Sequence, residues 1–285
     1  MTSDEIITAV LLKSGFPTDN YFSNAEMLIL MNDEMKLVIN PLVMKMQEDF
    51  FLQDKDYTIS SGASYRLPKR TLGSKVRDVK LYDNGAYVNL NRLYEEDRYK
   101  GLQGYYLNRN SLSLSPDITS GTLRVTYFLT PNQLVLTSAC AQIASIDSAT
   151  QVTVSALPST FSLTTPIDIV QADGQYDLLE IDKTITGIAG TAITFADLPT
   201  DLAVGDYICL AGQSPVPVIP SDLHPLLVQA VLCTCLSSKK DKAYEAEMVK
   251  LKDQTKAMLE MLDPRVESGD TFIIGQGLLS RIRNR

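Results

Sequence analysis

Residues 222–237 read DLHPLLVQAVLCTCLS, and apolar or small side chains fall on most faces of a helix built from them. A helix that is apolar all round is typical of one buried by its neighbours. Ser221 and Asp222 are good N-cap residues for it, and the proline-rich residues 215–220 form a stiff approach to it. The stretch predicts a central helix that other elements must cover.

Three further helices are predicted near the two ends of the chain. Residues 3–14 carry apolar side chains at i, i+3 and i+4, and residues 24–48 follow a capping box that begins at Ser23. Residues 240–262 show one apolar stripe and a lysine-rich face, and Pro264 stops the helix. We expect these helices to pack with the central one as a helical bundle.

Short alternating runs typical of antiparallel strands fill residues 51–134. A hairpin is predicted over residues 76–90, because the sequence DNG at residues 83–85 supplies the turn chemistry. Residues 105–114 are predicted to pair with residues 123–129. This part of the chain therefore reads as an antiparallel β domain.

The charge of the chain is concentrated in residues 135–212. The whole chain has 26 basic and 34 acidic side chains and a net charge of −8. The segment holds nine acidic side chains and one basic one, Lys183, so it accounts for the entire net charge. Its short β-rich runs are separated by turn residues, which predicts an inserted all-β domain, a barrel or a sandwich. Nucleic-acid phosphates would be repelled by such a segment.

The expected fold is therefore α+β, with a helical bundle, an antiparallel β domain and an inserted all-β domain. Its parts are the N-terminal helices at 1–50, the β domain at 51–134, the acidic domain at 135–212, the C-terminal helix pair at 213–262, and an extended tail at 263–285.

Composition excludes several classes of protein. Hydrophobic residues make up 45% and charged residues 21%, which is typical of a globular chain. No apolar run approaches the roughly 20 residues of a membrane helix, and residues 1–5 are acidic, unlike a secretory signal. Four cysteines are too few for a disulfide scaffold and fit a reducing compartment. The single histidine excludes multi-histidine metal sites.

Local motifs give no catalytic prediction. Ser221, Asp222 and His224 have the side chains of a catalytic triad, but they are adjacent at a helix start, where capping explains them. Cys233 and Cys235 diverge on a helix and are predicted to be small buried side chains. The acids of residues 135–212 are spaced too widely for a calcium loop and indicate a solvated negative face. The alternatives are a weak cation site or a docking surface for a basic partner. We predict no catalytic residue, cofactor or metal.

The tail at residues 263–285 combines apolar anchors with a basic end. An exposed apolar strip beyond the last helix usually indicates a binding partner. The alternative is that the tail folds back onto the chain's own sheet.

Four features of the sequence occur together: the helix 24–48 running into DFF at 49–51, the strand-turn-strand at 57–67, the helix pair at 222–262, and an ending of the form GD-x-F … G-LL-x-R at 269–281. With this order of parts, the chain resembles the head-to-tail adaptor (connector) proteins of tailed bacteriophages, especially the tail tubular protein A class of short-tailed phages. The resemblance covers the chain except for its acidic segment.

The resemblance implies a ring, typically a dodecamer, seated beneath the portal of a filled capsid. The helices would build the ring wall, the β domains would face the tail, and the C-terminal tails would dock into the portal. The implied portal-docking residues are Phe272, Ile273, Ile274, Leu278, Leu279, Arg281, Arg283 and Arg285.

The implied partners are the portal protein, a tail nozzle or tail tube protein, and further copies of the chain. The acidic domain would contact a collar, fibre or capsid protein. DNA would pass through the ring during packaging and ejection without sequence-specific binding, and no membrane is involved. The protein would lie in the bacterial cytoplasm during assembly and then at the head–tail junction of the virion. The alternatives are a tail nozzle or another tail-completion protein, and an Asp/Glu-dependent hydrolase with paired carboxyls.

Overall fold

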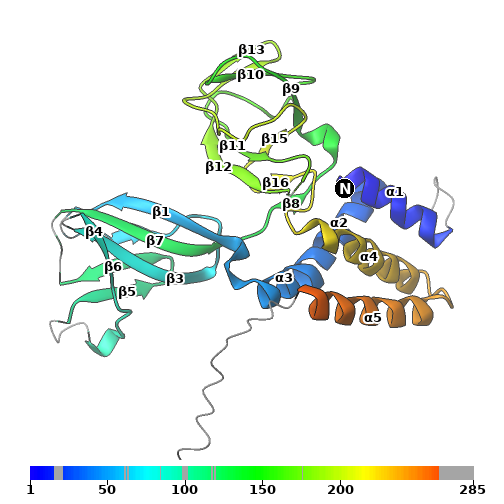
Figure 1. Ribbon diagram of the computed structural model, residues 1–285, viewed down its shortest axis with the longest axis horizontal. Helices are drawn as coiled ribbons and strands as arrows, with labels where there is room; N and C mark the ends of the chain where they lie inside the picture. The colour runs from blue at the N-terminus through cyan, green and yellow to red at the C-terminus, as the bar shows by residue number, and fades with distance from the viewer. Residues whose placement is uncertain are drawn as a thin grey trace, which may run out of the picture.

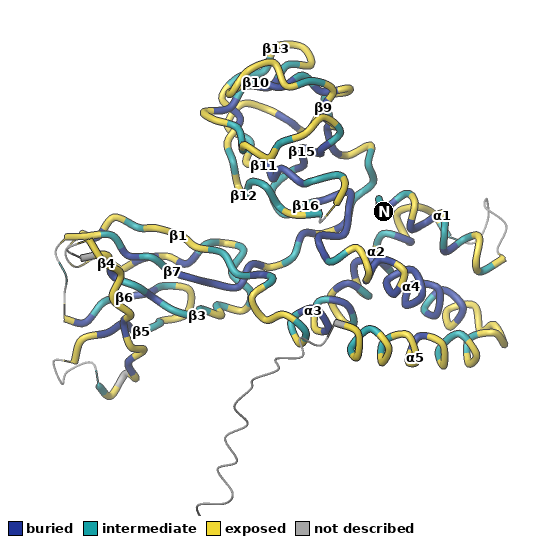
Figure 2. The backbone as a smooth tube through the Cα atoms, in the orientation of Figure 1, coloured by how far each residue is buried: buried dark blue, intermediate teal, exposed yellow. Residues whose placement is uncertain are grey.

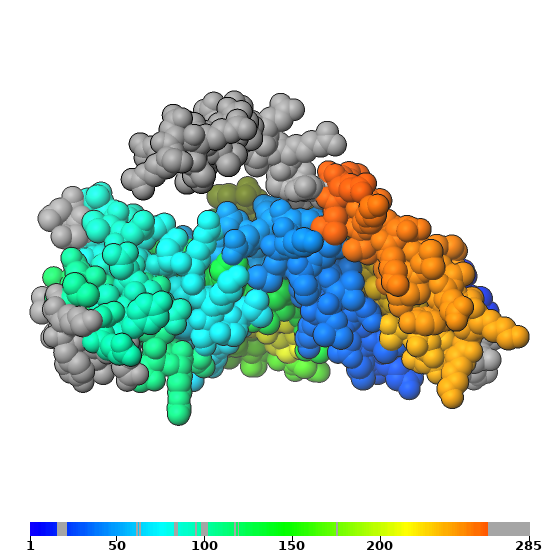
Figure 3. All heavy atoms as spheres, turned by 90° about the horizontal axis from the view of Figure 1, so that it is seen from below, coloured from blue at the N-terminus to red at the C-terminus, as the bar shows by residue number. Residues whose placement is uncertain are grey.

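The computed structural model describes residues 1–15, 22–60, 62, 64–83, 85–97, 102–116, 118, 120–174 and 176–262. The fold is mixed α+β: helices from both ends of the chain lie together, and antiparallel sheets occupy the middle of the sequence (Figure 1). Seen from below, the β domain and α5 lie at opposite ends of the molecule, with α2 and α3 between them (Figure 3).

Helix α4 (His224–Ser238) is the buried helix that the sequence predicts. Eleven of its 15 residues are buried, and a 3₁₀ turn (Ser221–Leu223) leads into it. Three helices contact it: α1 (Ser3–Ser14), α2 (Asn24–Glu34) and α5 (Tyr244–Leu262). Figure 2 shows α4 dark blue along most of its length, whereas α5 turns an exposed face outward. The prediction of all-round burial is confirmed.

Each of the helices α1 and α2 begins with a capping box. Thr2 and Ser23 each complete a capping box, with Glu5 and Glu26 respectively, and α1 ends at Gly15 in the left-handed conformation with φ 66. Both predicted helix starts are confirmed.

The predicted helix over residues 24–48 continues from α2 through a π-helical turn (Met35–Ile39) into α3 (Asn40–Met46). The π turn ends two residues before Pro41. The ring of a proline clashes with the preceding turn, and proline cannot donate a helical hydrogen bond. A short 3₁₀ segment (Glu48–Phe51) then leads into the β domain.

The β domain contains a four-stranded and a three-stranded sheet within the described residues. In spatial order these are β1 (Leu52–Thr58), β7 (Thr122–Leu129), β3 (Thr71–Asp83) and β4 (Ala86–Asn89), and then β2 (Ser64–Arg66), β6 (Ser111–Ser115) and β5 (Gly104–Asn108). The buried apolar side chains of both sheets form one cluster, which gives this domain a core of its own.

One strand pairing in this domain was predicted correctly and another was wrong. The β3–β4 hairpin is confirmed, with Tyr82 opposite Tyr87. Residues 105–114 do not pair with β7: they turn back at Arg109, which has φ 55, and form the β5–β6 hairpin. Strand β7 pairs instead with β1 on one side and β3 on the other.

The acidic segment forms a sheet of seven strands among the described residues, and all its pairings are antiparallel. The order is β12 (Leu178–Thr184), β11 (Pro166–Val170), β15 (Tyr207–Leu210), β9 (Ala141–Ile146), β10 (Gln151–Val154), β14 (Ala192–Thr194) and β13 (Gly187–Ala189). The outer strands β12 and β13 are not paired with each other, so the described sheet is open. The predicted barrel or sandwich is not confirmed.

A stem of two short strands joins the acidic domain to the helices. Strand β8 (Gln133–Leu134) enters the domain, β16 (Gln213–Ser214) leaves it, and the two pair in parallel. Asn32 of α2 clamps this stem from the helical side. Its Oδ1 accepts a hydrogen bond from the Leu134 amide at 2.7 Å, and its Nδ2 donates to the Leu134 carbonyl at 3.0 Å.

None of the helices that the structure describes combines the length and hydrophobicity needed to cross a membrane.

We expect Asn32→Ala to lower the free energy of unfolding by about 2–3 kcal/mol, because both buried backbone groups of Leu134 lose their partner. Urea unfolding followed by circular dichroism measures this change. Asn24→Ala is the matched control, because Asn24 is exposed at the start of α2. Equal urea midpoints for the two variants would contradict the role assigned to Asn32.

Candidate functional site

The predicted portal-docking residues all lie outside the described residues. These are Phe272, Ile273, Ile274, Leu278, Leu279, Arg281, Arg283 and Arg285. The candidate site that the structure does describe lies elsewhere, where the β domain meets the acidic domain.

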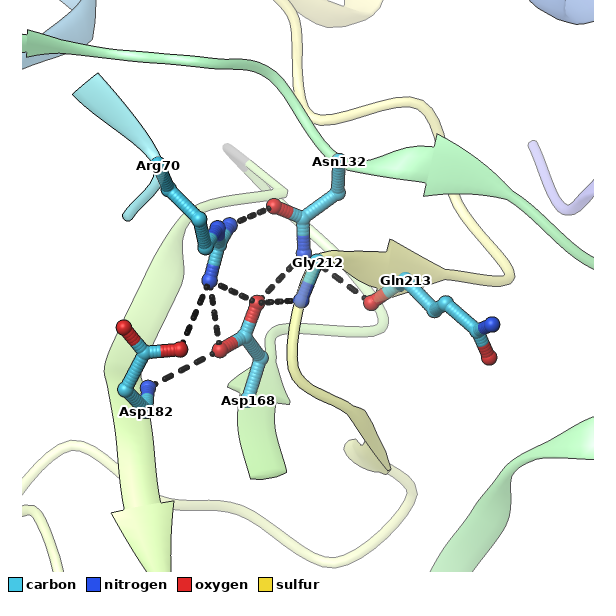
Figure 4. Close-up of polar contacts among 6 residues, drawn as sticks. All are labelled: Arg70, Asn132, Asp168, Asp182, Gly212 and Gln213. Atoms are coloured by element: carbon cyan, nitrogen blue, oxygen red, sulfur yellow. Dashed lines mark hydrogen bonds and ion pairs between the residues drawn. The ribbon is translucent and has the colours of Figure 1, made fainter. Parts of the chain in front are cut away.

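A buried ion pair lies at this junction (Figure 4). Arg70, just before β3, donates from Nη1 to both carboxylate oxygens of Asp168 in β11, at 2.9 and 2.8 Å. The Asp168 side chain is 0% exposed, whereas that of Arg70 is 14% exposed. An ionised carboxylate at such a depth is stable only if it is paired and hydrogen-bonded.

Three further donors complete the shell around Asp168. They are Asn132 Nδ2 at 2.8 Å, the Asp182 amide at 3.0 Å and the Gly212 amide at 3.0 Å. Gly212 has φ 83, a conformation that favours glycine. Asn132 also accepts a hydrogen bond from Arg70 Nη2. We call Arg70, Asn132, Asp168, Asp182 and Gly212 the junction cluster.

The junction cluster joins the β domain, the stem and the acidic domain. Arg70 belongs to the β domain, Asn132 to the stem that enters the acidic domain, and the other members to the acidic domain and its returning stem (Figure 4). Asp168 already accepts hydrogen bonds from every one of these residues, which leaves it little capacity for a substrate. The arrangement is therefore suited to fixing the domains together.

A cleft of about 730 Å³ opens beside the junction cluster. One wall is β1, with Gln53, Lys55 and Tyr57, and the other is residues 178–182 of β12. Both strands are edges of their sheets among the described residues. Such a cleft, with unpaired strand edges on two sides and charges of both signs, is suited to an extended peptide.

The described residues contain no group of three or more His, Cys, Asp or Glu side chains placed to hold a metal ion. Asp168 and Asp182 are neighbouring carboxyls of the kind that the hydrolase alternative requires, and both contact Arg70 Nη1, Asp182 at 3.5 Å. A carboxylate held in this way is a structural ligand of the guanidinium. The site therefore offers no observation that favours hydrolysis.

The residues of the triad interpretation are not assembled into one. Ser221 and Asp222 are exposed, and their predicted capping role is wrong: the N-cap of α4 is Leu223 and that of the preceding 3₁₀ turn is Pro220, each without a side-chain capping hydrogen bond. His224 is buried at the start of α4. His224 Nδ1 lies 3.0 Å from the Met1 amine, and its ring packs against the Tyr176 ring at a centroid distance of 4.6 Å. Burial, and then the positive charge of the amine, lowers the pKa of His224 to about 4.

Cys233 and Cys235 are each 1% exposed on α4. Cys235 Sγ lies 3.8 Å from Met27 Sδ of α2, and burial raises the pKa of this thiol to about 11. Their predicted role as small buried side chains is confirmed.

The solvated negative face predicted for the acidic segment is wrong for two of its nine acids. Asp168 is fully buried, and Asp206 is buried and accepts hydrogen bonds from the Ala172 and Ala203 amides. The sequence signal for Asp168 is its position in PIDIV at residues 166–170, because a carboxylate between buried apolar neighbours needs a partner. Nothing local in the sequence identifies Arg70 as that partner.

No model of a known protein family matches this sequence, and no curated protein matches it either.

We expect Arg70→Ala to lower the free energy of unfolding by about 3–5 kcal/mol, because it leaves the buried Asp168 carboxylate without a counter-ion. Urea unfolding measures the change. Arg124→Ala is the matched control, since Arg124 forms a two-bond pair with Asp56 on an exposed sheet face and should stay close to the wild-type midpoint. An equal loss of unfolding free energy in both variants would show that the junction cluster does not fix the β domain to the acidic domain.

Stability should also fall as the pH drops from 6.5 towards 4. The unfolded state binds a proton at His224 near pH 6.5, whereas the folded state binds it only near pH 4, so acid favours unfolding. The loss attributable to His224 is about 3 kcal/mol. The test is urea unfolding from pH 7 to 4 of the wild type and His224→Gln. The wild type should lose more stability than the variant. An equal dependence of the unfolding free energy on pH in the two proteins would contradict the role assigned to His224.

Proposed function

We propose that this chain is a structural virion protein, the head-to-tail adaptor of a tailed bacteriophage, which forms a ring beneath the portal and links the capsid to the tail. The observation that carries the proposal is the helical region built from both ends of the chain around α4, with a β domain that has a separate core. This is the order of parts on which the resemblance to the adaptor family rests. In the ring, the helices of neighbouring copies would complete a bundled wall.

Exposed apolar side chains support lateral contacts between copies. Leu12 of α1 is 78% exposed, and Val249 and Met261 of α5 are 57% and 59% exposed. Helices α1 and α5 lie on opposite sides of α4 (Figure 1), so each copy carries two different apolar surfaces. A ring requires this arrangement, because each copy presents one surface to one neighbour and a different surface to the other.

The acidic domain has its own sheet and its own buried core, which fits an added module on the outside of the ring. Three large apolar side chains remain exposed on it: Ile146, Leu163 and Val204. We propose that this surface contacts a collar, fibre or capsid protein. The barrel or sandwich form expected for this domain belongs to the same proposal.

The tail nozzle alternative is favoured by a different observation. Tyr82 and Tyr87 are exposed on the β3–β4 hairpin, with ring centroids 4.9 Å apart, and Val88 and Tyr94 are exposed nearby in the chain. Tyrosine-rich surfaces of this kind are common at interfaces. If Tyr87→Ser abolished self-assembly while removal of the tail had no effect on any binding, the nozzle would be the better assignment.

The proposal is tested by mixing the protein with its cognate portal ring and imaging the mixture by negative-stain electron microscopy. We expect a new collar on the portal with the full-length chain and none with a chain truncated after Pro264. A collar with both would keep the adaptor and remove the tail from docking. No collar with either, when both are folded, would overturn the adaptor proposal.

A point-variant pair makes the same test without truncation. Leu278→Asp with Leu279→Asp should abolish the collar, because it places two charges at proposed apolar docking positions. Gln276→Asp with Ser280→Asp is the matched control, since it adds the same charge at neighbouring polar positions and should retain the collar. Equal loss with both pairs would indicate a simple charge effect.

A further inference from the structure

Cys140 and Cys209 face each other at the base of the acidic domain. Strands β9 and β15 pair antiparallel, with Gln142 opposite Tyr207 and Ala141 opposite Ile208. Cys140 directly precedes β9 and keeps an extended backbone, with φ −113 and ψ 158. The same register therefore places Cys140 opposite Cys209.

This position suits a covalent link. Residues directly opposite each other in an antiparallel pair have Cα atoms about 4.5–5.5 Å apart. Disulfides span Cα separations of about 4.4–6.8 Å. The backbone therefore needs no large movement to join the two sulfur atoms.

The two thiols share one buried environment. Cys140 is 6% and Cys209 is 0% exposed, both are free thiols, and both belong to a small apolar cluster with Val170, Tyr207 and Val216. Burial, and then the neighbouring Cys140 thiol, raises the pKa of the Cys209 thiol. Cys140, the more accessible of the two, is the one that an external reagent would reach first.

We propose that Cys140 and Cys209 form a redox site of the folded protein and are joined by a disulfide when the chain meets an oxidising small-molecule disulfide. The Cys140 thiolate attacks one sulfur of the reagent, forms a mixed disulfide and releases one thiol. The Cys209 thiolate then attacks the Cys140 sulfur and releases the second thiol. The two cysteines lose two protons and two electrons in total, and the reagent is reduced to two thiols.

The link would close the acidic domain at its base. It would join the residue that precedes the first strand of the domain to its last long strand, β15, and so enclose residues 140–209 in a covalent loop. Cys209 also lies opposite Asp168 in the β11–β15 pairing. The link would therefore brace β15, the strand paired with the one that carries the buried carboxylate of the junction cluster. This inference stands on the β-sheet register and does not depend on the proposed function.

The experiment measures the disulfide in glutathione redox buffers. A chain carrying Cys233→Ala and Cys235→Ala retains only the proposed pair, and the wild type is measured beside it. Each protein is brought to equilibrium from the reduced folded state and also by refolding from urea in the same buffer. Free thiols are then blocked with a maleimide, and the mass is measured.

We expect both blocking groups to be missing from the pair in oxidising buffers, with a mass about 2 Da lower than that of the dithiol. Trypsin should then release residues 125–183 linked to residues 184–239. The melting temperature should rise by about 5 °C or more over the reduced form, because the closed loop is long.

The control chain carries Cys140→Ser and Cys209→Ser and retains Cys233 and Cys235, whose side chains diverge on α4. It should stay fully reduced in the same buffers. The proposal is overturned if the pair remains a dithiol from both directions while the protein is folded, or if the control forms a disulfide at the same buffer ratio.

Discussion

The buried carboxylate of Asp168 needs hydrogen-bond donors, and they come from four separate segments of the chain. Arg70 lies in the β domain, Asn132 in the stem, Asp182 in β12 and Gly212 in the returning chain. Losing the charged partner would leave an uncompensated charge in the interior. The placement of the acidic domain against the β domain depends on this requirement, and so does the cleft between β1 and β12.

The stem transmits this constraint to the helices. Asn132 contacts the junction cluster, and two residues later Leu134 is held by Asn32 of α2. A short stretch of linker is thus bound by buried polar contacts at both ends. Hydrogen bonds of this kind are directional, so they specify one geometry more strongly than apolar packing does. In the proposed adaptor, such a linker would keep the ring wall and the β domain in a fixed relation.

The parts of the fold that depend on local signals were predictable. The capping box at Ser23 and the apolar pattern of α4 identify helices, because these signals lie within a few residues of the element they define. The start of α5 was misplaced: the chain first makes a turn at Lys240, with φ 53, and the helix begins at Tyr244. Turn residues such as DNG identify the β3–β4 hairpin for the same local reason.

The pairings between distant segments were not predictable. The sequence does not show that β7 lies between β1 and β3, or that Arg70 contacts Asp168. These contacts join residues that are far apart in the sequence, 98 positions in the case of Arg70 and Asp168. The register that brings Cys140 and Cys209 together is equally invisible in one sequence. The candidate site was therefore missed.

The parallel pairing of β8 and β16 limits how the length of this chain can change in evolution. Two parallel strands cannot be joined by a tight turn and need a crossover of about a dozen residues or more. The acidic domain is therefore itself the crossover, and it is not a lengthened hairpin loop. A shorter relative could shed most of the domain's strands, but it would have to keep a connecting segment of that length to preserve the stem. The stem thus sets a lower limit on how far evolution could trim this part of the molecule.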